Sequence, residues 1–225
     1  MYLLNKNILC IGLVFIFSTS AIGQTNELGS WLVYFGNQKI DNKWNIQSDF
    51  QYRNYQIFDQ RNQMLIRAGV GYNLKDQNHN LLIGFAYVAS DTYDNTNVYT
   101  STKYENRIYQ QYLYKQKVND LYLSHRIRLE QRIFPNEFGL RGRYFVSLQK
   151  PIKGKTIARN SSYFSAYNEL FVDLKNAQFD RNRFYIGLGY GITEHVRVET
   201  GYMIQAQKNI SRGQMQLILI NNLPF

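Results

Sequence analysis

The sequence predicts an all-β fold, an antiparallel up-and-down β-barrel, because segments with two distinct faces recur along nearly the whole chain. Residues 121–134 show the pattern most clearly. One set of alternate positions holds Arg126, Arg128, Glu130 and Arg132, whereas most positions between them are Leu or Ile. Side chains of a strand point alternately to opposite faces, so this period of two indicates a strand with one polar and one apolar face.

Residues 1–23 have the layout of a secretory signal peptide. Lys6 supplies a charge, residues 8–17 are apolar, and the small residues at 21–23 fit a cleavage site that leaves Gln24 as the new N-terminus. The apolar run is too short to span a bilayer. Cys10 is the only cysteine and lies in this segment. The mature chain, residues 24–225, is therefore predicted to form a single domain without disulfides.

Eleven strand-like segments follow, and turn residues bound each of them. They are residues 29–40, 44–57, 63–74, 81–90, 103–118, 121–134, 140–150, 163–174, 183–191, 196–207 and 214–222. Short connections such as Asn119-Asp120 and Pro135-Asn136 have turn chemistry. Two connections, residues 91–102 and 151–162, are longer. Because single-chain bacterial barrels use an even number of strands, we expect about 12 strands, with 10 as the alternative.

Two classes of barrel have strands of this kind. In a soluble barrel such as a lipocalin the apolar face points inward, whereas in an outer-membrane barrel it meets lipid and the polar face lines the interior. The segments are long enough for tilted spanning strands, which need about 9–11 residues. Aromatic residues near segment ends resemble interfacial girdles: Trp31, Trp44, Tyr72, Tyr87, Tyr104, Tyr114, Tyr190 and Tyr202. These features favour the membrane barrel.

The end of the sequence adds to that prediction. Phe225 follows a two-faced segment, and a terminal aromatic resembles the signal by which bacterial outer-membrane barrels are recognised for insertion. We therefore expect the cell outer membrane of a Gram-negative bacterium as the location. The expected partners are outer-membrane lipid and, through Phe225, the barrel-assembly machinery.

The polar faces predict an interior rich in arginine. The charged residues in the inward phase are Asp49, Arg53, Arg67, Glu105, Arg107, Arg126, Arg128, Glu130, Arg132, Arg141, Arg143, Glu169, Asp173, Arg183, Arg197 and Glu199. Ten of these are arginines and six are carboxylates, which leaves about four positive charges inside. Two interpretations stay open: a narrow channel or binding barrel for small anionic solutes, or a plugged scaffold in which ion pairs join opposite walls. Nucleic acid is not an expected partner, because the basic residues are interior and lack an exposed aromatic platform.

No catalytic or metal site stands out, and we predict no enzyme and no cofactor. The mature chain has only His79, His125 and His195. His125 lies in the apolar phase and Ser124 in the opposite phase; a lipid-modifying enzyme on the outer wall is the rival function. Asp91, Asp94, Asn95 and Asn97 could supply oxygen ligands to Ca²⁺, but their spacing fits no known loop, which favours a solvated polar loop.

Short motifs spread over the mature chain resemble the uncharacterised Bacteroidota outer-membrane family called domain of unknown function 2490. The matching stretches are Gly29-Ser30-Trp31, Gln51-Tyr52-Arg53, residues 105–111, residues 125–132, Arg141-Gly142-Arg143-Tyr144, Asn168-Glu169, Arg181-Asn182-Arg183 and Gly201-Tyr202-Met203. The resemblance implies a barrel in the outer membrane. It implies no activity.

Overall fold

The computed structural model describes residues 23–24, 28–75 and 77–224, and these residues form strands joined by turns and loops. The strands are β1 (Gly23–Gln24), β2 (Gly29–Lys39), β3 (Trp44–Asn54), β4 (Arg61–Asn73), β5 (His79–Tyr93), β6 (Tyr99–Val118), β7 (Leu121–Ile133), β8 (Phe138–Pro151), β9 (Ser162–Asp173), β10 (Gln178–Gly191), β11 (Val196–Gln207) and β12 (Ile210–Asn221). This part of the chain contains no helix that could cross a bilayer. Phe225 and the predicted signal peptide up to residue 22 lie outside the described residues.

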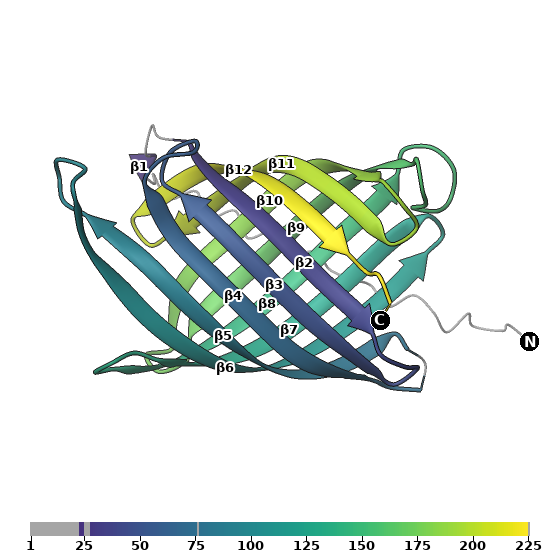
Figure 1. The fold of residues 1–225 in the computed structure, drawn as a ribbon, viewed down its shortest axis with the longest axis horizontal. Coiled ribbons are helices and arrows are strands. Elements are labelled where there is room, and N and C mark those ends of the chain that lie inside the picture. Colours follow the sequence, from purple (N-terminus) through teal and green to yellow (C-terminus); the bar gives the residue numbers. More distant parts are fainter. Residues whose placement is uncertain (1–22, 25–27, 76, 225) are drawn as a thin grey trace, which may run out of the picture.

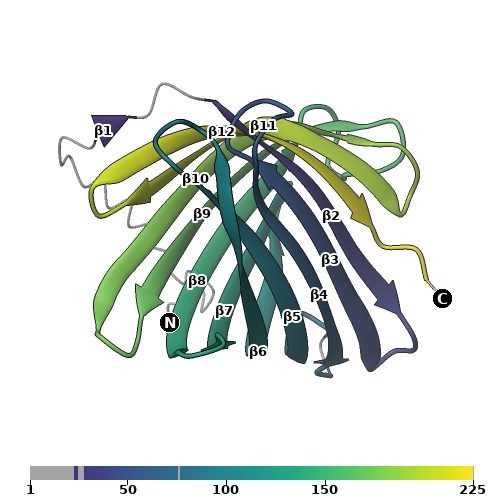
Figure 2. The same ribbon diagram turned by 60° about the vertical axis from the view of Figure 1, so that its left-hand side comes forward.

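Strands β2 to β12 form a closed barrel. Each strand pairs with its neighbours along the chain, and the wall closes because β12 also pairs with β2. This closing pair is parallel, with Gln214 beside Gly29 and Asn221 beside Gly36. All other pairs between neighbours in the wall are antiparallel. The arrows of β2 and β12 accordingly point the same way in Figure 1, and Figure 2 shows β12 between β11 and β2.

The all-β barrel is confirmed, but its wall has eleven strands, between the two expected counts. The short strand β1 is the twelfth strand of the sheet. It pairs with Ile210 and Ser211 on the same edge of β12 that β2 occupies further along. An odd number of strands forces the first and last strands to run parallel, which is why the closing pair departs from the antiparallel rule.

The odd number also gives the barrel two different ends. At the N-terminal mouth, where β2 begins, lie the connections 55–60, 94–98, 134–137, 174–177 and 208–209. At the C-terminal mouth, where β12 ends, lie the connections 40–43, 74–78, 119–120, 152–161 and 192–195. The connection expected at 91–102 is mostly strand, because β5 and β6 continue as a hairpin that projects beyond the rest of the wall (Figure 1).

The two faces of the wall differ in chemistry. Outward side chains are apolar and accessible, for example Ile83 at 59 % and Leu188 at 55 % exposed. Inward side chains are mainly charged, amide or aromatic, and Glu130 is only 1 % exposed. Gly187 and Gly189 leave space for the side chains of Tyr185 and Tyr163, and a Cβ at either glycine would collide with them. Here glycine relieves crowding inside the barrel.

Candidate functional site

The interior contains a network of arginines and carboxylates, and Glu130 of β7 lies near its centre. Arg141 of β8 donates to Glu130 Oε2 from Nε at 3.0 Å and from Nη2 at 2.6 Å. Arg143, two residues along the same face, donates to Oε1 at 2.5 Å. Arg107 and Arg128 approach the same carboxylate at 3.8 and 3.6 Å. Four guanidinium groups thus surround one buried carboxylate, and they offset the cost of removing its charge from water.

A second cluster forms around Glu169 of β9. Its Oε1 accepts hydrogen bonds from Arg126 at 2.7 Å and from Arg143 at 2.6 and 3.0 Å. Arg183 of β10 lies 3.6 Å from the other carboxylate oxygen. Because Arg143 contacts both Glu130 and Glu169, the two clusters form one connected network across β7, β8, β9 and β10.

The network continues toward the N-terminal mouth. Glu105 of β6 is held by two arginines, each through two hydrogen bonds: Arg107 at 2.6 and 2.8 Å, and Arg132 at 2.5 and 3.1 Å. Asp49 of β3 pairs with Arg67 of the neighbouring strand β4. Arg107 and Glu105 lie on the same strand, whereas Arg132 joins β7 to β6 and Arg67 joins β4 to β3. The bidentate pair of Arg132 with Glu105 fixes the planar guanidinium as well as its charge, so it also helps to hold neighbouring strands in register.

Two buried arginines donate hydrogen bonds to glutamine side chains and make cation–π contacts with aromatic rings, whereas most of the arginines described above donate to carboxylates. Arg53 donates to the side-chain oxygens of Gln51 and Gln63, and its guanidinium lies 3.9 Å from the ring centroid of Trp31. Arg128 donates to Gln111 and lies 4.5 Å from the ring of Tyr109. Cation–π contacts and amide oxygens stabilise a guanidinium without neutralising it. Arg128 also lies 3.6 Å from Glu130. Positive charge inside the barrel is therefore least compensated at Arg53, which donates to amides and contacts a ring.

Trp31 differs from its expected place. The sequence pattern assigns it to an outer aromatic girdle, but the ring is inside the barrel and 4 % exposed. It contacts Arg53 and, at 4.9 Å, Arg183 of β10. The reason is the strand phase: Trp31, Val33 and Phe35 share the inward face of β2.

Side chains from strands that are not neighbours meet inside the barrel. Gln111 of β6 donates to Gln47 of β3 at 3.4 Å, and Gln149 of β8 donates to Glu199 of β11 at 2.7 Å. Arg141 reaches Asp180 of β10 at 3.2 Å. Such contacts, together with side chains of the Glu130 cluster that are at most 7 % exposed, fill the middle of the interior.

The remaining predicted residues lie toward the two mouths. Glu199 accepts hydrogen bonds from Gln149 and from Tyr163 at 2.8 Å, and Arg197 donates to Gln149 at 3.4 Å. Asp173, at the end of β9, is not joined to the network. Its carboxylate instead accepts backbone hydrogen bonds from the turn residues 175 and 176.

Sequence reasoning missed Asp180 and Arg181. Strict alternation from Arg183 places Asp180 on the outer face, but a register shift between Phe179 and Arg181 turns its carboxylate toward Arg141. The four consecutive polar residues 180–183 are the only local signal of this bulge. The interior aromatics Phe171 and Tyr185 were missed as well, because aromatic side chains occur on both faces of these strands.

Residues 124 and 125 do not form the Ser–His pair that a lipid-modifying enzyme on the outer wall would use. His125 Nδ1 lies 2.9 Å from the hydroxyl of Tyr144 on the outer face, whereas Ser124 faces the interior opposite Ser147. Asp91 is bound by Arg61 at 2.7 and 2.9 Å. Asp94 accepts hydrogen bonds from Thr96 and Val98, which lower its pKa and close the turn. The described residues hold no group of three or more potential metal-ligating side chains.

Comparison with known proteins gives one match. The family model described as "Protein of unknown function (DUF2490)" matches residues 28–216, which is nearly all of the described barrel. No curated protein and no solved structure matches the chain. The chain therefore belongs to the DUF2490 family of proteins of unknown function.

Proposed function

We propose that the protein is an outer-membrane β-barrel with a sealed interior, which binds small anionic solutes at one mouth and does not conduct them. The chemistry of the outer wall supports the membrane part. Phe85, Ile127 and Leu188 are 51, 57 and 55 % exposed on the outside of the barrel, while charged groups occupy the inside. A soluble barrel has the opposite arrangement, and accessible apolar area of this extent costs free energy in water.

Aromatic pairs at two heights on the wall support the same location. Near the C-terminal mouth, Trp44 packs edge-on against Tyr72 with ring centroids 4.9 Å apart. Further toward the N-terminal mouth, Tyr87 stacks on Tyr104 at 6.1 Å. Tyr72 pairs with Leu81 of β5, six residues before Tyr87. At about 3.3 Å per residue with a tilt near 40°, the two aromatic pairs are roughly 15 Å apart along the barrel axis. Both pairs therefore fit within the height of an outer-membrane barrel, whose apolar band is about 25 Å tall.

The buried network is the observation that carries the sealed interior. The charged residues at the middle of the barrel are each at most 7 % exposed, so water hardly reaches them: Arg107, Arg128, Glu130, Arg141 and Arg143. A conducting pore needs a wetted path with charges that ions can approach. Paired charges in contact with each other instead join the walls.

The C-terminal mouth supports the binding of anions. Basic side chains there exceed acidic ones among the described residues. The basic ones are Lys39, Lys43, Lys75, Lys115, Lys117, Lys150, Lys153, Lys155, Arg159 and Arg197, and the acidic ones are Asp41, Asp120, Glu194 and Glu199. Such a field raises the local concentration of anions at the mouth.

Conductance of the purified protein in a planar bilayer tests the proposal. The wild type is expected to insert, as judged by heat-dependent gel migration, without producing conductance steps. The double variant Arg143→Ala/Glu169→Ala removes one buried pair and conserves net charge, so it is expected to conduct and to prefer anions.

Lys150→Ala/Asp120→Ala is the matched control, because it removes an exposed pair that is 3.8 Å apart at the C-terminal mouth. This control is expected to remain closed. Conductance steps from the wild type would overturn the sealed interior.

A further inference from the structure

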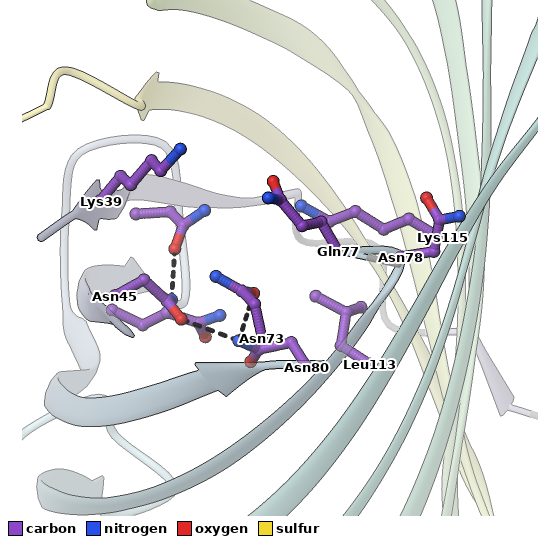
Figure 3. A pocket seen from close by; sticks show the side chains of 10 residues that line it. Lys39, Asn45, Asn73, Gln77, Asn78, Asn80, Leu113 and Lys115 are labelled. Atoms are coloured by element: carbon purple, nitrogen blue, oxygen red, sulfur yellow. Dashed lines mark hydrogen bonds between the residues drawn. The ribbon is translucent and has the colours of Figure 1, made fainter. Parts of the chain in front are cut away.

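A recess at the C-terminal mouth has polar walls and a volume of about 120 Å³ (Figure 3). Strands β2 to β6 and the β4–β5 connection contribute to it. The lining residues are Asn37, Lys39, Asn45, Gln47, Asn73, Gln77, Asn78, Asn80, Leu113 and Lys115. Nine of these ten side chains are polar, which distinguishes the recess from the apolar crevices on the outer wall.

Four asparagines of the recess form a chain of side-chain hydrogen bonds. Asn45 donates to Asn37 at 2.7 Å, and Asn80 donates to Asn45 at 2.7 Å and to Asn73 at 2.8 Å. Asn45 and Asn80 are only 4 and 6 % exposed. Asn80 Nδ2 thus donates both of its hydrogens to side-chain oxygens. The dashed lines in Figure 3 follow this chain.

Gly71 gives this chain of amides its space. A Cβ at position 71 would collide with the side-chain oxygen of Asn45 and come within 2.9 Å of both polar atoms of Asn80. The side-chain amides of Asn45 and Asn80 therefore pack directly against the backbone of β4. Any side chain at this position would displace them.

Hydrogen-bond donors that the chain of amides does not use are available for an anion. Asn37 and Asn73 both use their side-chain oxygens as acceptors, so their NH₂ groups are available. Lys39 and Lys115 add two ammonium groups, and Figure 3 shows them on different sides of the recess. Among the described residues that line the recess, none is acidic.

One buried acceptor completes the pattern. Asn80 Oδ1 has no hydrogen-bond partner among the described residues, although it is shielded from solvent. A buried acceptor without a donor costs about 1–3 kcal/mol. An oxyanion alone cannot supply that donor, whereas a hydroxyl next to the oxyanion can.

We propose that this recess binds a small hydroxylated oxyanion, with the anionic group on Lys39, Lys115 and the asparagine amides, and a hydroxyl donating to Asn80. The inference deepens the proposed anion binding and rests on it. The volume admits a few non-hydrogen atoms beyond a single water, so the group bound is a small hydroxy acid or the corresponding end of a larger solute.

Titration of the full barrel in detergent micelles tests this inference, with the side-chain amide NMR signals of Asn45 and Asn80 as the readout. The probes are glycolate, acetate and ethylene glycol, which separate the charge from the hydroxyl. Glycolate is expected to bind about 2–10-fold more tightly than acetate, the effect of one added hydrogen bond. Ethylene glycol is expected to bind least, because it has no charge for the lysines.

The variants locate the site. Lys39→Gln/Lys115→Gln is expected to weaken glycolate binding at least about tenfold, since hydrogen bonds to charged groups are the strong ones. Lys117→Gln is the matched control. Lys117 is on β6 like Lys115, but it does not line the recess, and its ammonium lies 4.7 Å from the ring of Tyr122. Gly71→Ala keeps every charge and is expected to abolish the preference for glycolate over acetate.

Three results would overturn the recess as the site: no binding of glycolate, equal effects of the Lys39/Lys115 and Lys117 variants, or equal affinity for glycolate and acetate. The bilayer experiment is independent of these. A closed barrel without glycolate binding would refute the recess and leave the sealed interior intact, whereas a conducting wild type would refute the sealed interior alone.

Discussion

At the scale of the residue, the contribution of a buried carboxylate to stability depends on how many guanidinium groups it pairs with. Glu130 accepts hydrogen bonds from Arg141 and Arg143 and has Arg107 and Arg128 close by. Arg128, in contrast, donates only to the neutral Gln111. Removing one partner of a buried ion pair is costly mainly because the other charge stays buried and unpaired. Loss of Glu130 would therefore leave buried arginines without their carboxylate, whereas loss of Arg128 would leave Glu130 still paired.

We predict that Glu130→Gln lowers the free energy of unfolding by about 3–5 kcal/mol. Arg128→Met is expected to cost less, because it leaves Glu130 with its two hydrogen-bonded arginines and removes only the hydrogen bonds to Gln111 and the cation–π contact with Tyr109. Urea unfolding in micelles, followed by gel migration, measures both. Glu137→Gln, in the exposed turn after β7, is the control and is expected to resemble the wild type. Equal losses for Glu130→Gln and Arg128→Met would contradict the central role of Glu130.

The outward residues pose a separate test at the same scale. Ile83 is 59 % exposed in the middle of the outer band, and Phe58 is 78 % exposed in a connection at the N-terminal mouth. We predict that Ile83→Arg reduces assembled barrel and costs about 2–4 kcal/mol, because Arg would lie in hydrocarbon. Phe58→Arg is expected to have little effect. Normal assembly of both variants would favour a barrel in water, where an exposed Arg is harmless.

At the scale of the element, alternation in the sequence was sufficient to predict the strands and much less informative about their ends. All eleven expected segments correspond to strands β2 to β12, because each segment keeps one face for the interior and one for the outside. Errors arise where the pattern is interrupted. Residues 55–57 are in a connection whose Phe58 and Gln60 have positive φ angles, and the bulge near Arg181 brings Asp180 inside. Such backbone changes leave hydrophobic periodicity nearly unchanged.

The parallel pairing of β12 with β2 could not be predicted from the sequence. Pairing between neighbours in the chain follows from short turns, but pairing of β12 with β2 joins residues almost the whole chain apart, and no periodicity encodes its direction. An even number of strands was expected by analogy with bacterial outer-membrane barrels. The eleven segments visible in the sequence were themselves the better guide.

We predict that cysteines at Leu32 and Leu217, paired across β2 and β12, form a disulfide in the assembled barrel. Adjacent strands place paired Cα atoms within the range that a disulfide spans. Leu32→Cys with Leu219→Cys is the control, shifted by two residues on the same outer face, and is expected to cross-link less. Gel migration with and without reductant measures the yield, and Cys10, the only cysteine of the sequence, lies in the predicted signal peptide. Preferential cross-linking of the shifted pair would refute the parallel register.

At the scale of the whole molecule, the odd strand number and the charge distribution make the barrel asymmetric. The described chain enters the wall at one mouth and leaves it at the other. The C-terminal mouth carries the basic side chains and the connection 152–161, which is the longest in the wall. The N-terminal mouth carries the projecting β5–β6 hairpin instead. The interior network lies between these two surfaces. In the sealed membrane barrel that we propose, each mouth would therefore meet only the solutes of its own compartment.

This asymmetry predicts which connections share a side of the membrane. A peptide tag inserted after Gly154 and one inserted after Asn222 are expected to be accessible from the same side of the membrane, because both positions lie at the C-terminal mouth. A tag inserted after Asn95, in the β5–β6 turn, is expected on the opposite side. Antibody binding to intact cells, compared with permeabilised cells, assigns each tag. If the tags at residues 95 and 154 were both accessible on intact cells, the barrel would not span the membrane in this orientation. Access to the Gly154 tag alone would place the basic mouth and its recess outside the cell, where they would meet solutes from the surroundings.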